Sequence, residues 1–307
     1  MNQLPIGLVF PGQGTQKMGM GEVWRNTPSW HLTEKISEVT GEDLPELLLR
    51  TPAEQLRRTD LAQLTVFTVA MIANAEAVRT GTLGGPVVAC AGHSLGEYAA
   101  LAAAGALTVE AAASLVAARG RAMRRAAEDR EGTMAVLVAA PASEVEALVG
   151  EVRATGPDVW VANVNAPGQT VVSGSLEGID RVDAAAPSIG AKLIRLQVGG
   201  AFHSPYMAPA ADALRTAFKN TAFAAVHLPV VANVDAVPYT GDCDWAELGT
   251  RQLTSPVLWE RSVLMLTRTL GCGRLVELGP GRTLAGLIRR IDPDIEVMSV
   301  DDPGVLH

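Results

Sequence analysis

Ser94 stands in a Gly-x-Ser-x-Gly stretch, an arrangement typical of a serine nucleophile. It follows the apolar run 87–90 and precedes an Ala- and Leu-rich stretch that begins at Leu95. Gly92 and Gly96 let the backbone turn sharply from strand to helix, so the serine oxygen projects from the end of a sheet and the next N–H points to the same place. The pattern predicts nucleophilic catalysis with an oxyanion donor beside the serine.

The same residues allow a structural interpretation, because Ser94 and Glu97 have the spacing of a helix capping box. In such a box the hydroxyl only accepts a hydrogen bond from a free helix N–H. Capping by itself does not require Gly92 and Gly96 on either side of the serine, so the spacing favours the nucleophile.

A serine hydroxyl is a weak nucleophile at neutral pH and needs a base within hydrogen-bond distance. His203 is the favoured base, because it lies in a loop preceded by glycines, and functional residues are concentrated in loops. No acidic side chain is an obvious partner for it, so a backbone or amide carbonyl is expected to orient the imidazole. The other histidines are less suited by position: His31, His93, His227 and His307.

The order of these groups along the chain disfavours an ordinary esterase. In α/β-hydrolases the serine is followed by an acid and then by a histidine near the end of the chain. Here His307 is the only histidine that follows the last expected strand.

Arg119 is a candidate for binding an anionic group. Taken alone, it has a competing interpretation as one member of a solvated basic helix face with Arg121, Arg124 and Arg125. The residue types by themselves favour that second interpretation.

Composition narrows the function classes. The 307 residues include 25 basic and 33 acidic side chains, a net charge of −8, which disfavours binding to nucleic acid. The three cysteines show no metal-ligand spacing, so neither a zinc site nor a disulfide framework is expected. No leader is recognisable and no uninterrupted apolar run approaches the roughly 20 residues that cross a bilayer, so a cytoplasmic protein without a membrane association is expected.

Alternating strands and helices predict an α/β fold with a mostly parallel sheet. The chemistry-bearing turn follows a strand at 87–90, and further strands are expected at 5–10, 229–233 and 275–278. Helices are expected at 61–78, 95–107, 206–218 and 256–270.

The segment 131–198 has a different pattern, in the order β-α-β-β-α-β, which is typical of ferredoxin-like modules. We expect it to form a small inserted subdomain. Residues 1–130 and 199–307 would then form the catalytic domain.

Taken together, eight motifs between about residues 8 and 290 resemble those of malonyl-CoA:acyl carrier protein transacylases, the free-standing acyltransferases of fatty-acid or polyketide synthesis. The motifs are Gly12-Gln13-Gly14-Thr15-Gln16, Gly92-His93-Ser94-Leu95-Gly96-Glu97, Arg119-Gly120-x-x-Met123, Asn163-x-Asn165-x-Pro167-Gly168-Gln169, Ala201-Phe202-His203-Ser204, Asn233-Val234-Asp235, Arg251-Gln252-Leu253-x-Ser255-Pro256-Val257-x-Trp259 and Glu277-x-Gly279-Pro280-Gly281. The resemblance implies an α/β-hydrolase-like core that carries a ferredoxin-like small domain.

The resemblance also implies roles for catalytic residues. Ser94 would attack the thioester of malonyl-CoA, and His203 would act first as base and then as acid. The main-chain carbonyl of Gln252 would orient the imidazole. Gln13 and Leu95 would direct backbone N–H groups at the oxyanion.

Substrate contacts follow from the same motifs. Arg119 would receive the free malonyl carboxylate with its planar fork. Phe202, before the catalytic histidine, resembles the malonyl-selective form of the motif and would exclude a methyl branch, although a single methyl changes affinity by only about 1–3 kcal/mol. Further substrate-binding residues are predicted within the matching motifs: Met123, Asn163, Asn165 and His93.

The implied cycle uses a CoA thioester and the phosphopantetheine thiol of a holo-acyl carrier protein, with no permanently bound cofactor and no metal. We expect a monomer. Because carrier proteins are acidic, a local basic docking patch is expected among seven residues: Arg121, Arg124, Arg125, Lys192, Arg195, Arg289 and Arg290. The alternative function is a hydrolase of the same fold that removes acyl groups from carrier proteins.

Overall fold

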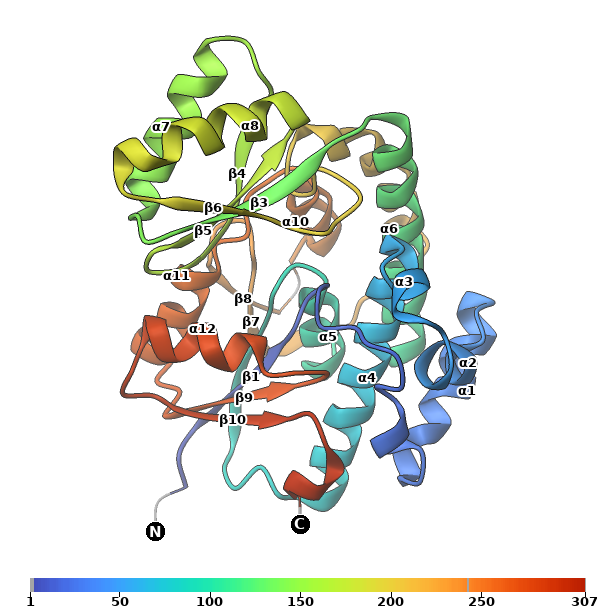
Figure 1. Cartoon of the computed structure of the whole chain (residues 1–307). Helices are drawn as coiled ribbons and strands as arrows, with labels where there is room; N and C mark the ends of the chain where they lie inside the picture. The colour runs from blue at the N-terminus through green and yellow to red at the C-terminus, as the bar shows by residue number, and fades with distance from the viewer. Residues whose placement is uncertain (1–2, 242, 307) are drawn as a thin grey trace.

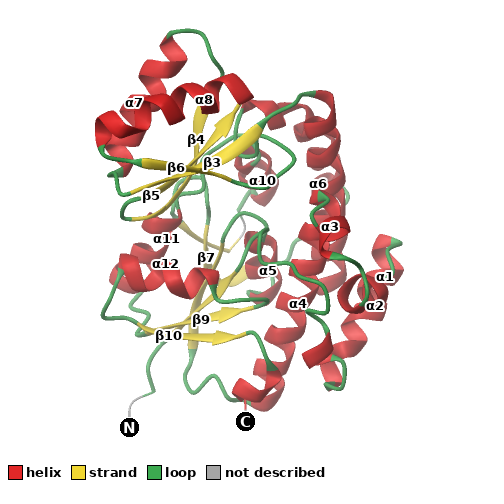
Figure 2. Cartoon of the chain, viewed as in Figure 1, coloured by secondary structure: helices red, strands yellow, loops and turns green. Residues whose placement is uncertain are grey.

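The computed structural model describes residues 3–241 and 243–306, and its larger sheet is mostly parallel (Figures 1 and 2). Within those residues the strand order is β10-β9-β1-β2-β7-β8, and β8 alone runs antiparallel to its neighbour. The strands are β1 (Ile6–Phe10), β2 (Val87–Gly92), β7 (Val226–Val231), β8 (Pro238–Gly241), β9 (Arg274–Leu278) and β10 (Glu296–Val300). The predicted α/β class is confirmed.

Helices cover both faces of this sheet, so its central strands are buried on both sides. In β1, Leu8 and Phe10 belong to the core beneath α4, α5 and α6, whereas Val9 belongs to the core beneath α11 and α12. The helices outside the small sheet are α1 (Leu32–Thr40), α2 (Leu44–Leu49), α3 (Ala53–Leu56), α4 (Thr59–Thr80), α5 (Gly96–Ala103), α6 (Val109–Asp129), α9 (Ala211–Lys219), α10 (Trp245–Gln252), α11 (Trp259–Leu264) and α12 (Thr283–Ile291).

Helix α4 lies at the centre of the helical layer. By length and composition it could cross a membrane, yet 83% of its apolar window is buried inside the protein. Core helices of this kind pass the same test, so the burial accounts for the apolar composition. The prediction that no apolar run approaches membrane length therefore has an exception in α4, which is long and apolar but buried in the core.

A second sheet lies above the first in Figure 1, and all its strand pairs are antiparallel. Its order is β4-β5-β3-β6, and α7 and α8 pack on one face. Its elements are β3 (Thr133–Val138), α7 (Ala142–Ala154), β4 (Val159–Ala166), β5 (Gln169–Gly174), α8 (Leu176–Ala185) and β6 (Lys192–Arg195). The sequence order matches the predicted ferredoxin-like module, while the domain boundaries at 131 and 198 stay a prediction.

Several predicted helices are shorter than expected. The helix at 95–107 ends at Ala103, because Gly105 adopts a left-handed φ of 82°. The helix at 206–218 is divided into a 3-10 turn and α9, and the one at 256–270 is divided into α11 and a π-turn. The sequence interpretation did not include β8, β10, α10 or α12.

One connection ties the two sheets together. Between α10 and α11, the backbone N–H of Val257 donates to the carbonyl of Ala162 at 2.9 Å, and the N–H of Val164 donates to the carbonyl of Val257 at 2.9 Å. The carboxyl end of β4 is thereby held close to the turn that carries Ser94, where Asn165 contacts His93.

Candidate active site

Ser94 lies at the turn between β2 and α5 with a φ of 52°, in the left-handed region that non-glycine residues seldom adopt. The flanking glycines are required by space. A Cβ on Gly92 would lie 1.9 Å from the carbonyl carbon of Gly96, and one on Gly96 would lie 2.1 Å from the carbonyl oxygen of Phe10. The predicted strand-turn-helix geometry is confirmed, and the Ser94 side chain does not cap α5.

The Ser94 hydroxyl meets His203, which follows β6 in a loop and also has a positive φ, 57°. The distance from Oγ to the imidazole Nε2 is 2.7 Å. The other ring nitrogen, Nδ1, lies 2.9 Å from the backbone carbonyl of Gln252. A carbonyl can only accept, so Nδ1 carries the proton, and Nε2 is free to accept the serine proton.

Arg119 reaches the same hydroxyl from α6, where it is 1% exposed. Its Nη2 donates to Ser94 Oγ at 3.1 Å and to the side-chain carbonyl of Gln252 at 3.0 Å, and its Nη1 donates to Gln63 Oε1 at 2.6 Å. Its Nε is buried with no hydrogen-bond partner in the part of the chain that is described. The guanidinium therefore lies in the pocket without a carboxylate partner among the described residues, and the solvated-face interpretation is wrong for Arg119.

Two backbone N–H groups remain for an oxyanion. Gln13 and Leu95 line the pocket beside Ser94. Within residues 3–241 and 243–306, neither backbone N–H has a hydrogen-bond acceptor. The family resemblance assigned these two donors to an oxyanion, and that role stays a prediction.

The pocket has a volume of about 240 Å³, and both parts of the structure line it: Met134 and Val171 from the small sheet, and Ser94 and Leu95 from the turn after β2. Its wall includes every remaining residue that the sequence assigned to substrate binding: Met123, Phe202, Asn163, Asn165 and His93. Two of them contact each other, with His93 Nε2 2.8 Å from Asn165 Oδ1, and the His93 ring packs edge-on against Trp259.

Burial sets the electrostatics of the pocket. It lowers the pKa of His203 to about 3, and the charge of Arg119 contributes in the same direction. Burial raises the pKa of Glu97, whereas the N–H donors of Asn233 and Gln252, one at each carboxylate oxygen, and the charge of Arg119 favour its ionised form. The pKa of His93 is also lowered by burial. Both histidines are therefore neutral at physiological pH, as a general base requires.

Sequence reasoning gave no catalytic or binding role to three buried polar residues of the site. Gln63 holds Arg119 from α4, Asn233 Oδ1 accepts from the backbone N–H of Ser94 at 2.6 Å, and Glu97 accepts from Asn233 and Gln252. The available signal was a polar side chain within an apolar stretch, as at Gln63 in α4.

The other candidate histidines lie elsewhere. His31 is exposed, with Nδ1 2.8 Å from the carbonyl of Pro28. His307 lies outside the described residues, and the side chain of His227 is likewise not described. Among the residues that are described, no group of three or more His, Cys, Asp or Glu side chains could hold a metal ion.

Comparison with known proteins places this geometry in a family. The acyl transferase domain family matches residues 8–290. The malonyl CoA-acyl carrier protein transacylase of Bacillus subtilis strain 168 is 35% identical over 98% of this chain and 95% of the relative. The polyketide biosynthesis malonyl CoA-acyl carrier protein transacylase BaeC of Bacillus velezensis is 35% identical, over 95% of this chain and 98% of the relative.

A solved complex of a type II polyketide acyl-carrier protein with its malonyl-transacylase gives a TM-score of 0.92 and 33% identity, over 98% of this chain and 97% of that one. Fold, active-site geometry and sequence thus agree along nearly the whole chain. The chain belongs to the acyl transferase domain family, within the group of malonyl CoA-acyl carrier protein transacylases.

Proposed function

We propose that this protein moves a malonyl group from malonyl-CoA, through an ester on Ser94, to the phosphopantetheine thiol of an acyl carrier protein. One observation carries the proposal: a base and a cation converge on a single hydroxyl. Ser94 Oγ lies 2.7 Å from His203 Nε2 and 3.1 Å from Arg119 Nη2. A serine nucleophile is thereby placed within reach of a group that binds carboxylates.

In the first half-reaction, the Ser94 proton passes to His203 Nε2 while Oγ attacks the thioester carbonyl. The developing oxyanion is held by the N–H groups of Gln13 and Leu95, each a donor of the kind that contributes about 3 kcal/mol in comparable sites. The C–S bond then breaks, and His203 returns the proton to the departing CoA thiolate. Gln252 keeps the imidazole oriented through its carbonyl.

Arg119 receives the distal carboxylate of the malonyl group. Two parallel N–H donors from one guanidinium match the two carboxylate oxygens. An acyl group without the carboxylate leaves the buried cation unpaired, which is costly. Phe202 in the pocket wall, 6% exposed, supports a preference for the unbranched malonyl unit.

In the second half-reaction, His203 takes the proton of the carrier thiol, and the sulfur attacks the Ser94 ester. The C–O bond breaks and the proton returns to Ser94, so one thioester is exchanged for another and the cycle is reversible with ping-pong kinetics. No permanently bound cofactor takes part. The hydrolase alternative is disfavoured, because the relatives with similar sequences are named transacylases. We further propose a cytoplasmic monomer without nucleic-acid or membrane partners.

Intact-protein mass spectrometry tests the function directly. The protein is incubated with malonyl-, methylmalonyl- or acetyl-CoA and then with a holo-carrier. We expect a gain of one malonyl mass on the enzyme, which then moves to the carrier, with malonyl-CoA the best donor. Release of free malonate in place of carrier loading would instead support the hydrolase.

The depressed pKa of His203 predicts an unusual acid limb. Because that pKa lies near 3, against an ordinary value of 6.5, kcat/KM for acylation should stay level between about pH 6.5 and 4. A histidine with an ordinary pKa would lose about tenfold per pH unit in that range. Stopped-flow acylation measured across the range distinguishes the two.

The same shift has a consequence for stability. Between pH 6.5 and about 3 the unfolded chain binds a proton at His203 that the folded chain does not. The free energy of unfolding should therefore fall as the pH drops through this window. A His203→Asn variant should show a shallower decline in chemical denaturation.

The structure divides the seven basic residues expected to form a docking patch. Three are already engaged: Arg124 with Asp60 and Glu128, Arg195 with Asp180, and Arg290 with Gln169 and the carbonyl of Pro167. Arg121 and Arg125 lie on the face of α6 opposite Arg119 and Met123, by helical spacing. Lys192 is the first residue of β6. Arg195 is the last residue of that strand, and it directly precedes the pocket residue Leu196.

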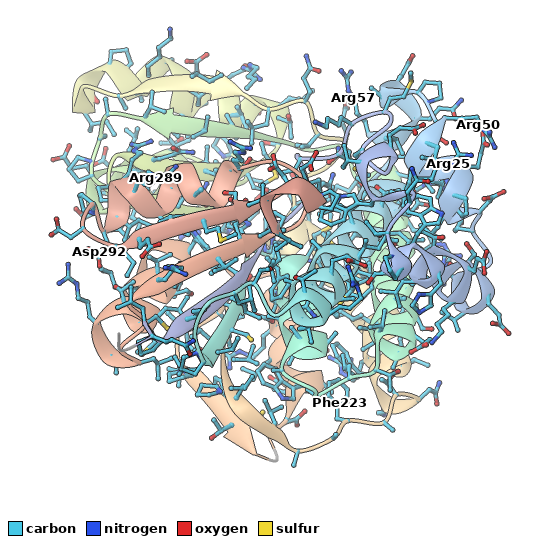
Figure 3. The ribbon with its side chains drawn as sticks, turned by 90° about the horizontal axis from the view of Figure 1, so that it is seen from below. Arg25, Arg50, Arg57, Phe223, Arg289 and Asp292 are labelled. Carbon is cyan, nitrogen blue, oxygen red and sulfur yellow. The ribbon has the colours of Figure 1, made fainter. Side chains whose placement is uncertain are left out.

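We propose that two exposed cations near the pocket attract the acidic carrier: Arg195, which precedes pocket residue Leu196, and Arg289 on α12, which supplies pocket residue Leu287. The ion pair of Arg195 with Asp180 is itself exposed and therefore weak, so carboxylates of the carrier can replace Asp180. Arg289 is exposed and lies on the opposite side of the view from Arg25, Arg50 and Arg57 in Figure 3. Reversal of Arg195 and Arg289 to Glu should lower kcat/KM for the carrier about tenfold at low salt, with a smaller effect at high salt. The rate at which the malonyl ester is hydrolysed, or passes to a small thiol in place of the carrier, should not change.

The matched control is the reversal of Arg121 and Arg125 to Glu. It changes the net charge by the same amount, on the face of α6 that lies opposite the pocket residues Arg119 and Met123. Equal effects from both pairs would indicate a response to net charge alone. An unchanged carrier kcat/KM in the Arg195 and Arg289 variant would remove the patch from the proposal.

A further inference from the structure

One buried carboxylate beneath the turn holds the two residues that support the site. Glu97, in the first turn of α5, is 2% exposed. Its Oε2 accepts from the backbone N–H of Asn233 at 2.6 Å, and its Oε1 accepts from the side-chain amide of Gln252 at 3.0 Å. The reaction described above gives this carboxylate no task.

Each of its two partners holds a reacting group. Gln252 accepts from His203 Nδ1 through its backbone carbonyl and from Arg119 Nη2 through its side-chain carbonyl. Asn233 accepts from the backbone N–H of Ser94 and donates to the carbonyl of Gly92 at 2.6 Å. The nucleophile, the base and the cation are therefore all one residue removed from the same carboxylate.

The side-chain amide of Gln252 can serve Arg119 in only one orientation. Its nitrogen lies 3.0 Å from the backbone carbonyl of Ser94 and 3.0 Å from Glu97 Oε1, and both of these oxygens are acceptors. Its oxygen faces the Arg119 donor. A turned amide would place NH₂ against the guanidinium, donor against donor, and would remove one of the acceptors that hold Arg119 Nη2.

We propose that Glu97 is a positioning residue that fixes the Gln252 amide and, through it, holds Arg119 in place for the malonyl carboxylate. The inference rests on the proposed function, because it concerns selection among the acyl groups of that reaction. Selection between malonyl and other acyl groups then depends on Glu97, which is not among the residues that line the pocket.

The Glu97→Gln variant tests this while keeping the size of the side chain. Both Glu97 oxygens face N–H donors, whereas a glutamine has only one oxygen, so one donor must lose its acceptor whichever way the new amide turns. We expect kcat/KM for malonyl-CoA to fall about 10- to 100-fold, and that for acetyl-CoA to fall about tenfold less. In an Arg119→Ala background, the same substitution should add little to the loss with malonyl-CoA.

The matched control is Glu76→Gln. Glu76 is also a buried glutamate, 1% exposed, and accepts from the backbone N–H of Ser29 at 2.8 Å, but neither residue lines the pocket. It should lower the melting temperature without changing the ratio of malonyl to acetyl activity. An equal fall for both acyl groups in the Glu97 variant would reduce Glu97 to a structural role and overturn the proposal.

A crystal structure of the Glu97→Gln variant gives a readout that needs no substrate. The expected result is a Gln252 amide that no longer accepts from Arg119. An unchanged contact between Gln252 Oε1 and Arg119 Nη2 would overturn the positioning role. Failure of the wild-type protein to acquire a malonyl mass would instead contradict the proposed function, so the two failures are distinct.

Discussion

A Ser94→Ala variant is expected to lose malonyl transfer by about a millionfold in kcat, the scale seen when a serine nucleophile is removed from a catalytic unit. The hydroxyl is the atom that forms the covalent ester, and His203 has no other proton to accept at that position. Intact-protein mass spectrometry after incubation with malonyl-CoA should show the unmodified mass. Peptide mapping of the wild-type protein should place the malonyl group on the peptide that contains Ser94.

The matched control for this loss is Ser114→Ala. Ser114 lies on α6 and its Oγ donates to the backbone carbonyl of Glu110 at 3.0 Å, apart from the pocket. This variant should acquire the malonyl mass at the wild-type rate. Malonyl loading that persists in Ser94→Ala would contradict the covalent role and would move the ester to another residue.

The second large effect is expected at Arg119. Its replacement by Ala removes both charge-assisted hydrogen bonds to the malonyl carboxylate, a kind of loss that costs about 2–5 kcal/mol at a buried site. The kcat/KM for malonyl-CoA should therefore fall by about 30- to several thousandfold, while Lys at this position should restore only part of it. Acylation by malonyl-CoA and by acetyl-CoA, measured side by side, gives the ratio.

Acetyl-CoA supplies the control, because its acyl group has no carboxylate. The Arg119→Ala variant should use acetyl-CoA at least as well as the wild type does, since no buried guanidinium remains unpaired beside the acyl methyl. If both donors lost activity to the same degree, Arg119 would be acting on the Ser94 hydroxyl alone, and the proposed carboxylate contact would be wrong.

The turn at Ser94 could be predicted from the sequence because its determinants are local. Gly92 and Gly96 lie within two residues of Ser94, and each is required by a close backbone approach. The partner histidine lies 109 residues away. Its selection depended on a loop position and on a family resemblance, since spacing along the chain does not determine a distance in space.

The supporting amides were beyond such reasoning. Gln63 contacts a guanidinium 56 residues away. The direction of the Gln252 amide follows from two acceptors, the Ser94 carbonyl and Glu97 Oε1, and from one donor on Arg119. Helical periodicity detects neither contact, because it reports only which face is apolar. The early end of the helix after Ser94 had a local signal in Gly105, which the apolar pattern outweighed.

The stretch that links α10 to α11 has a consequence for attempts to exchange parts between relatives. Gln252 at its start orients the imidazole, Val257 in its middle pairs with β4, and Trp259 at its end packs against His93. In a chimera that carries a foreign 131–198 segment, the new β4 would have to pair with Val257 of the host chain. Inserts chosen for acyl preference must therefore be matched to host residues about sixty positions downstream of the last strand of the insert. A mismatch there would displace both the new pocket wall and the carbonyl that orients the general base.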